Sequence, residues 1–466
     1  IKIINEVALH KRSKNMKFEI LKKSHLKRNI IIGVGVILII SAIILNFTRA
    51  KYRTSQSIPL VNGTINYTPY DFKMVAMYQE NNNGEYVEIE TMPSSGYVIN
   101  ESKSYCTIDN ANKDEDVFLY TNNAGEHVIS NLKKNSKCYL YFDEVGPLSA
   151  EQAILTYAKR GSGTPNFTNT SCSNGSNNGG NCEEATIGLY EGTENDETIY
   201  YFRGDVDDNW VSFAGFYWRI IRTNSDDSIR MIYNGTNTAT TGSGTQISLN
   251  GSTTTYAFNS SYNASYYVGL KYSNSQHGTT TNSSIMTTLN TWFSNNLTSY
   301  ASYLTSGTGF CNDREMANDS SWSATPSSDI FYAGYERLVS NKIPTLDCSN
   351  NNDKFTTSGT GTGNGTLSNP IGLITADEVA MAGAVYRTTN YGYYLYTNSI
   401  YWTMSPSYFN SYNSRANVFR VYSSGSLNND NSLYNMGGIR PVINLKADVI
   451  LTGSGTTSDP YEVVGT

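Results

Sequence analysis

The sequence has few charged residues, and this shortage limits the structures that it can form. Only 16% of the 466 residues are Asp, Glu, Lys or Arg, whereas soluble domains usually contain about 25%. Neutral residues replace them, including 36 Tyr and 38 Gly. This mix favours strands and turns over helices, because aromatic residues favour strands and Gly favours turns. The composition predicts a β-rich α+β fold.

The sequence also lacks a metal-binding pattern. It has four His and six Cys, and no two Cys form a C-x-x-C motif, so we expect no zinc site. An even number of Cys outside the cell favours disulfides. Pairing of neighbours along the chain predicts the disulfides Cys106–Cys138, Cys172–Cys182 and Cys311–Cys348. Free thiols in a reducing compartment are the alternative.

One long hydrophobic run is present, at residues 30–47, and it contains no charge. Nine Lys or Arg lie before it in residues 1–29, and three follow it closely. This asymmetry predicts a single-pass transmembrane anchor in the plasma membrane, with the N-terminus in the cytoplasm and the rest outside. A cleaved signal peptide is the alternative, but Thr48-Arg49-Ala50 is a poor cleavage site.

The charge is unevenly distributed along the chain. Residues 1–29 have a net charge of +7, although the whole chain has −6. The exterior is therefore acidic, and nucleic-acid binding is not expected because it needs a basic surface.

The pattern of short alternating runs and polar clusters after the anchor divides the chain into parts. The predicted parts are a cytoplasmic basic tail (1–29), a transmembrane anchor (30–47), a stalk (48–60), a small Ig-like β-sandwich (61–145), a helix with a disulfide-clipped linker (146–184) and a ligand-binding domain (185–466). The sandwich is expected to be a spacer.

Three helices are predicted from local signals. Ser149 and Gln152 form a capping-box pattern, and so do Thr375 and Glu378. Between them, Ser284 to Leu304 has apolar residues on one helical face.

Six motifs in the last part of the chain carry a resemblance to a known group. They are Tyr200-Tyr-Phe-Arg-Gly204, Phe213-Ala-Gly-Phe-Tyr-Trp-Arg-Ile-Ile-Arg222, Phe310-Cys-Asn-Asp-Arg314, Gly372-Leu-Ile-Thr-Ala-Asp-Glu-Val379, Tyr401-Trp-Thr-Met-Ser-Pro406 and Gly438-Ile-Arg-Pro-Val-Ile-Asn-Leu445. As a set they resemble surface proteins of gut Firmicutes and mollicute-like relatives. The C-terminal stretch is also similar to the C-type-lectin-like fold of formylglycine-generating-enzyme relatives and of the variable proteins of diversity-generating retroelements.

The second resemblance implies a ligand face between the strand at Tyr401–Met404 and Arg440. In the variable proteins, altered positions derive from adenine-rich codons, of which Asn, Ser and Tyr are expected products. The residues expected to bind a ligand are Tyr408, Asn410, Tyr412, Asn413, Asn428, Asn429, Asn431, Tyr434 and Asn435. Tyr and Asn are also typical of paratopes. The alternatives are that Tyr408 and Tyr434 pack inward, and that the crowding reflects ordinary composition.

Little in the sequence indicates catalysis. The four His are scattered, and no nucleophile motif is present. A copper-holding cysteine pair, which the enzyme resemblance would require, is absent if all Cys form local disulfides. Asp205, Asp207 and Asn209 resemble the start of a calcium loop, but Trp210 stands at the position of its glycine. We therefore expect no cofactor, with a solvated turn favoured over calcium.

The expected function is a bacterial cell-surface binding protein, an adhesin or lectin-like receptor for a glycan or protein. A structural envelope protein without a specific ligand is the alternative, followed by a formylglycine-generating-enzyme-like enzyme.

Overall fold

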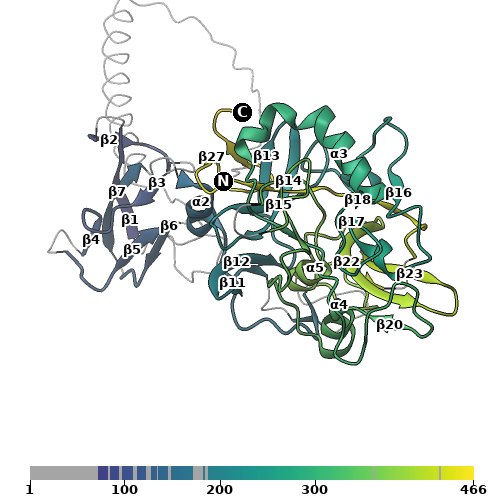
Figure 1. Ribbon diagram of the computed structural model, residues 1–466. Helices are drawn as coiled ribbons and strands as arrows, with labels where there is room; N and C mark the ends of the chain where they lie inside the picture. The colour runs from purple at the N-terminus through teal and green to yellow at the C-terminus, as the bar shows by residue number, and fades with distance from the viewer. Residues whose placement is uncertain are drawn as a thin grey trace, which may run out of the picture.

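A computed structural model describes residues 72–81, 84–93, 97–108, 113–121, 127–133, 135–144, 148–171, 182–183, 187–359, 363–429 and 432–466. These residues form a small unit and a large unit, both rich in strands (Figure 1). The predicted β-rich class is confirmed. The predicted anchor at 30–47 lies outside the described residues, and no helix among those described is long and apolar enough to cross a bilayer.

The small unit consists of a five-stranded sheet and a hairpin. The sheet has the order β2-β1-β7-β3, and β4 also pairs with β7. Strands β5 and β6 form the hairpin. The bounds are β1 Phe72–Glu80, β2 Tyr86–Ile89, β3 Tyr97–Ile99, β4 Tyr105–Ile108, β5 Phe118–Thr121, β6 His127–Ser130 and β7 Ser136–Glu144.

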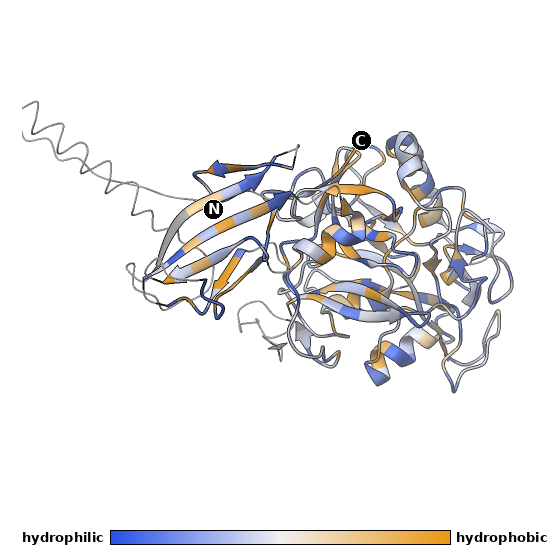
Figure 2. Ribbon diagram, turned by 90° about the vertical axis from the view of Figure 1, so that its left-hand side faces the viewer, coloured by the Kyte–Doolittle hydropathy of each residue, from blue (hydrophilic) through white to orange (hydrophobic). Residues whose placement is uncertain are grey.

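Strand β7 organises the small unit because every second side chain is buried. Its inward residues Cys138, Leu140 and Phe142 have no exposed surface, and they pack in one cluster with Leu119 and Ile129 of the hairpin. Figure 2 shows the matching alternation of hydrophobic and hydrophilic residues along these strands. The period of two places one face of the sheet in the core.

The large unit begins earlier in the chain than residue 185. Strand β8 (Leu148–Ser149) pairs with β27 (Ile450–Thr452) near the other end of the chain. Helix α2 (Ala150–Tyr157) follows, with the predicted capping box of Ser149 and Gln152. Its apolar side joins the core of the large unit. The first part of the predicted linker 146–184 therefore packs as part of the large unit.

Two sheets form the frame of the large unit. The nine-stranded sheet has the order β11-β12-β14-β13-β28-β27-β8, with β15 joining β14 to β26. The six-stranded sheet has the order β16-β25-β22-β23-β24, with β20 beside β22. The bounds are β11 Gly188–Glu194, β12 Glu197–Arg203, β13 Trp210–Phe213, β14 Phe216–Thr223, β15 Ile229–Tyr233, β16 Thr255–Ala257, β20 Ile330–Phe331, β22 Tyr401–Asn410, β23 Arg415–Val421, β24 Leu427–Asn428, β25 Met436–Gly438, β26 Val442–Leu445 and β28 Tyr461–Val463.

Short strand pairs and helices fill the connections. The pairs are β9 (Thr170–Ser171) with β10 (Cys182–Glu183), β17 (Lys271–Tyr272) with β18 (Thr281–Asn282), and β19 (Phe310–Cys311) with β21 (Lys354–Phe355). The helices are α3 Ser284–Asn296, α4 Ala333–Tyr335 and α5 Ala376–Ala382, the 3₁₀ turns η1 Gly242–Thr245, η2 Ser265–Val268 and η3 Thr298–Tyr303, and the π-helical η4 Glu336–Asn341.

The sequence predicted the positions of two of these helices well. The helix expected over Ser284–Leu304 is α3 followed by η3, and it buries Ile285, Leu289 and Phe293. The expected capping box of Thr375 and Glu378 begins α5.

A buried arginine links the two sheets. Arg440 follows β25 and has no exposed surface. It donates hydrogen bonds to the carbonyl oxygen of Tyr233 in β15 (3.0 Å) and to Asn234 Oδ1 (2.7 Å). Its guanidinium also lies 5.0 Å from the ring centroid of Tyr401 in β22. Because buried guanidinium groups need several acceptors, these contacts hold β22 at a defined position against β15.

Candidate functional site

The predicted ligand-binding residues gather around the hairpin of β22 and β23. This hairpin lies at the end of the large unit away from the small unit (Figure 1). Strand β22 continues to Asn410, beyond the predicted end at Met404, because it pairs with both β20 and β23. Tyr408 and Asn410 therefore lie in a strand, where the sequence had suggested a loop.

The tip of the hairpin is fixed by hydrogen bonds. The carboxylate of Asp329 accepts from the backbone N–H of Ser411 (2.7 Å) and from its hydroxyl (2.8 Å). Asn410 Oδ1 accepts from the backbone N–H of Asn413 at 2.8 Å. Tyr412, between them, keeps 92% of its surface exposed. The tip thus presents a free tyrosine ring on a restrained backbone.

The hairpin has one buried and one outward side. Tyr408 pairs with Asn417, and Asn410 pairs with Arg415. Directly opposite residues and alternate residues share a face of a sheet, so these four side chains lie on one side, where Tyr408, Asn410 and Arg415 are half-buried and Asn417 is buried. Their neighbours Phe409, Ala416 and Val418 are buried on the other side. We call the outward side, with the aromatic rings that contact it, the hairpin face.

Two aromatic groups contact the hairpin face. On one flank, Tyr408 stacks with Phe331 at a centroid distance of 5.9 Å, and Tyr335 lies 4.5 Å from Phe331. On the other flank, Tyr434 lies 4.7 Å from Tyr262 and 5.1 Å from the guanidinium of Arg415. The hairpin face therefore carries aromatic rings on both flanks and polar groups between them.

The remaining predicted residues differ in exposure. Asn413 is exposed, Asn428 and Asn435 are half-buried, and Asn429 is only 2% exposed. Asn431 lies outside the described residues. Tyr434 is 39% exposed and Tyr408 is half-buried, so both rings pack against the protein on one side and remain open on the other.

Three residues of the hairpin face were missed from the sequence. Phe331, Tyr335 and Tyr262 come from segments far from residues 408–435, and only strand pairing and tertiary packing bring them near. No local signal in the sequence indicates this proximity.

Burial and neighbouring charges affect the phenol groups on this side of the large unit. Burial raises the pKa of Tyr408, Asp329 and Tyr335 raise it further, and Arg387 opposes the change. Burial also raises the pKa of Tyr386, again opposed by Arg387. Both phenols are therefore neutral hydrogen-bonding groups at neutral pH.

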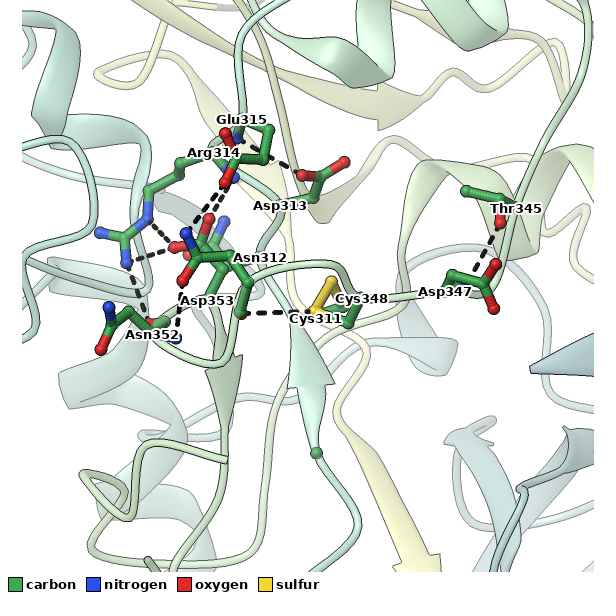
Figure 3. The surroundings of a disulfide bond; sticks show 12 residues. Cys311, Asn312, Asp313, Arg314, Glu315, Thr345, Asp347, Cys348, Asn352 and Asp353 are labelled. Carbon is green, nitrogen blue, oxygen red and sulfur yellow. Dashed lines mark hydrogen bonds and ion pairs between the residues drawn. A yellow bond between two sulfur atoms is a disulfide. The ribbon is translucent and has the colours of Figure 1, made fainter. Parts of the chain in front are cut away.

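A disulfide closes the loop that supplies Phe331 and Tyr335. Cys311 and Cys348 are bonded, with Cα atoms 5.8 Å apart (Figure 3). The predicted Cys106–Cys138 disulfide is also confirmed, between directly paired residues of β4 and β7. The predicted pair Cys172–Cys182 falls outside the side chains that the structure describes.

Ion pairs restrain the same loop at two points along its length. Near its start, Arg314 Nη2 lies 2.6 Å from Asp353 Oδ1 (Figure 3). Further along, Arg337 pairs with Asp377 at 3.0 Å and with Asp313 at 2.8 Å. The loop is therefore restrained by charge pairs as well as by its disulfide.

A second charged network lies inside the large unit. Glu378 Oε1 accepts from Arg222 Nε at 3.0 Å and forms an ion pair with Arg230 Nε at 2.5 Å, and Arg222 also pairs with Glu194 at 2.9 Å. Burial would raise the pKa of Glu378, but Arg230 and Arg222 lower it below its usual value. This network lines a cavity of about 20 Å³ beside Cys311 and Cys348, which is room for a single water molecule.

The described residues offer no metal centre. Among them, no group of three or more His, Cys, Asp or Glu could hold an ion. In the loop that resembled a calcium site, Asp207 accepts from Trp210 Nε1 and Thr457, and Asn209 Oδ1 accepts from Arg219. Protein donors therefore already use these oxygens.

No known protein-family model matches the sequence, and neither a curated protein nor a solved structure is similar to it. The geometry of the hairpin face is therefore the basis for assigning a function.

Proposed function

We propose that the chain is a membrane-anchored bacterial cell-surface protein that binds an extracellular glycan or protein through the hairpin face. The observation that carries this proposal is the combination of Tyr408 and Tyr412 on one supported hairpin with Tyr434 packed on its flank. Tyrosine rings supply large contacts at low entropic cost, and amides beside them supply hydrogen bonds. Binding residues on a rigid scaffold are the usual arrangement in recognition proteins.

Three further features support an extracellular binding role. The two disulfides of the described residues suit an oxidising compartment. The hydrophobic run at 30–47, with its basic flank, suits an anchor with a cytoplasmic N-terminus. The hairpin face lies on the side of the large unit away from the small unit, as expected if the small unit is a spacer. We also propose a C-type-lectin-like fold for the large unit, on the basis of its C-terminal motifs.

The test is attachment by the full-length chain displayed on a host cell. Replacing Tyr408, Tyr412 and Tyr434 together by Ala should abolish attachment to target cells or to immobilised glycans. The matched control replaces Tyr200, Tyr217 and Tyr256, which are partly exposed tyrosines outside the hairpin face, and should attach like the unaltered chain. Attachment that survives the first triple substitution would contradict the proposal.

A structural envelope protein is the second candidate. It is favoured by the small volume of two cavities of the large unit, about 20 Å³ beside Cys311 and Cys348 and about 10 Å³ beside Tyr386. A purely structural role predicts that neither triple variant changes attachment, while loss of the chain alters cell shape or envelope integrity.

A further inference from the structure

Two cationic side chains approach one tyrosine ring next to the hairpin face. Lys342 Nζ and the guanidinium carbon of Arg387 each lie 5.1 Å from the ring centroid of Tyr386. Arg387 is exposed, and Lys342 and Tyr386 are half-buried. Such contacts attract a cation to an aromatic face and fix its position. The two positive charges are therefore both held around the ring of Tyr386.

Both cationic residues have an unusual backbone. Lys342 has φ 57° and Arg387 has φ 52°, a region that costs non-glycine residues roughly 1–2 kcal/mol. Lys342 ends η4, where this conformation is common. Arg387 lies in a tight turn closed by the Thr388 N–H and the Val385 carbonyl, where glycine or asparagine would be favoured. Such strain often accompanies a ligand clamp.

This cationic pair adjoins the aromatic flank of the hairpin face. The backbone N–H of Arg387 donates to the carbonyl oxygen of Leu427 at 2.8 Å, and two residues later the carbonyl oxygen of Asn429 accepts from the hydroxyl of Ser407, next to Tyr408, at 3.1 Å. Tyr386 itself forms a bridge with Leu427. The segment from Leu427 to Asn429 therefore joins the cationic pair to the strand that carries Tyr408.

A buried acceptor lies beneath the same place. Asn429 is 2% exposed, and its Oδ1 has no hydrogen-bond partner. Buried acceptors without partners are rare and costly.

We propose that Lys342 and Arg387 bind the carboxylate or sulfate of an acidic glycan whose sugar ring lies against Tyr408 and Tyr335. This inference rests on the proposed function and names its ligand class. The local positive charge contrasts with the acidic chain, whose net charge is −6 despite its basic first 29 residues. Guanidinium and ammonium groups form strong charge-assisted hydrogen bonds with such anions.

An acidic peptide fits this surface less well. Peptide ligands usually anchor an apolar or aromatic side chain in a pocket. The cavity beside Tyr386, lined also by Leu338 and Leu427, has only about 10 Å³, so it cannot accept a side chain. Flat half-exposed rings with hydroxyl and amide groups suit a sugar.

The test measures binding of the full-length protein to four polymers: hyaluronan with carboxylates, heparin with sulfates, neutral dextran and polyglutamate. We expect at least one acidic polysaccharide to bind about ten-fold more tightly than dextran and polyglutamate, and to weaken as salt is raised. Comparing hyaluronan with heparin identifies the anion. Equal binding of dextran, or tighter binding of polyglutamate, would overturn the proposal.

Two double variants each remove two positive charges, one at the proposed binding site and the other at a control site elsewhere on the large unit. Lys342→Gln with Arg387→Gln should weaken acidic-glycan binding about ten-fold. Lys159→Gln with Arg160→Gln is the control, because Arg160 also lies over a tyrosine ring, that of Tyr200. If both pairs of substitutions weaken binding equally, the effect is general charge and the proposal is wrong.

Folding and the underlying function are checked separately. Arg387→Gln alone changes an exposed side chain, so it should keep the melting temperature and still weaken acidic-glycan binding. Full binding by this variant would contradict the role of Arg387. If no acidic glycan binds but attachment still requires Tyr408, Tyr412 and Tyr434, the ligand class is wrong and the proposed function stands. If attachment does not need these tyrosines, the proposed function itself fails.

Discussion

The ring of Tyr408 stacks on the ring of Phe331, with centroids 5.9 Å and planes 21° apart. The two residues are direct partners in the antiparallel pairing of β20 and β22. This contact joins the hairpin to the loop closed by Cys311 and Cys348, so that the stability of one affects the other.

Two single substitutions on the hairpin should separate stability from binding. Tyr412→Ala removes a ring that is 92% exposed, so the free energy of unfolding should change by less than about 0.5 kcal/mol while attachment weakens. Tyr408→Ala removes a stacked ring and should lower that free energy by about 1–3 kcal/mol. Chemical denaturation and an attachment assay measure both. A large destabilisation by Tyr412→Ala would show that this ring packs against the protein, which contradicts its exposed position.

Removal of each disulfide should have a different consequence. Replacing Cys311 and Cys348 by Ser opens a loop with a sequence separation of 37, which should cost about 3–4 kcal/mol in the chain-entropy model. Attachment should weaken as well, because the loop positions Phe331 and Tyr335. Replacing Cys106 and Cys138 by Ser is the control: it should destabilise the small unit and leave attachment intact. Equal loss of attachment in both variants would contradict the link between the loop and the hairpin face.

The buried carboxylate of Glu378 should be essential for folding of the large unit. Glu378→Gln leaves Arg222 and Arg230 without one negative partner in a buried site, which should lower the free energy of unfolding by about 3–5 kcal/mol. Thr375→Ala, which removes only the helix cap, should cost about 1 kcal/mol. Thermal and denaturant unfolding would measure the two effects. Similar small losses would show that the carboxylate charge is unimportant.

The small unit should lose stability in acid because of His127. Burial lowers the pKa of its imidazole to about 4, below the value of about 6.5 in an unfolded chain. Between these two pKa values, His127 of the unfolded chain takes up a proton, whereas His127 of the folded chain does not. The free energy of unfolding therefore falls as the pH drops from the unfolded pKa to the folded pKa, by at most about 3 kcal/mol. His127→Gln should flatten this part of the pH profile measured by thermal unfolding.

His277 should have the opposite effect on the pH dependence of stability, so it serves as the control. A hydrogen bond to Asp353 raises the pKa of its imidazole, so its contribution to stability is present below about pH 6.5 and is lost as pH rises through the folded pKa. His277→Gln should therefore remove stability mainly on the acid side. If neither substitution changes how stability depends on pH, these histidines are not the cause of that dependence.

The predicted membrane topology can be tested on intact cells. An uncleaved anchor at 30–47 with a cytoplasmic N-terminus predicts that external protease removes everything beyond about residue 50 and leaves the basic tail protected. N-terminal sequencing of the mature protein is the second measurement. A mature chain that starts near Ala50 or Lys51 would indicate a cleaved signal peptide.

The sequence predicted those features that depend on neighbouring residues. The capping boxes at Ser149 and Thr375 were recognisable because the cap and its partner are three residues apart. The disulfides Cys106–Cys138 and Cys311–Cys348 followed from proximity along the chain. Strand β22 was predicted too short, because its second half is stabilised by β20 and β23, and pairing between distant segments leaves no local pattern.

The same limit applies to the candidate site. Tyr408, Tyr412 and Tyr434 were identified from local crowding of Tyr and Asn. Lys342 and Arg387 come from η4 and a distant turn, so their common position over Tyr386 depends on tertiary packing. Asn429 was predicted as a ligand-binding residue, but the fold buries it.

The parallel pairing of β1 and β7 determines how the small unit responds to a pulling force. The chain enters this unit through β1 and leaves it through β7, and the two strands are paired side by side from Phe72 with Ser136 to Gln79 with Phe142. A pull between the two ends of the unit therefore slides the strands along each other, so their hydrogen bonds share the load and must break together. In a single-molecule stretching experiment the small unit should open in one high-force step, which makes it a tether that resists shear.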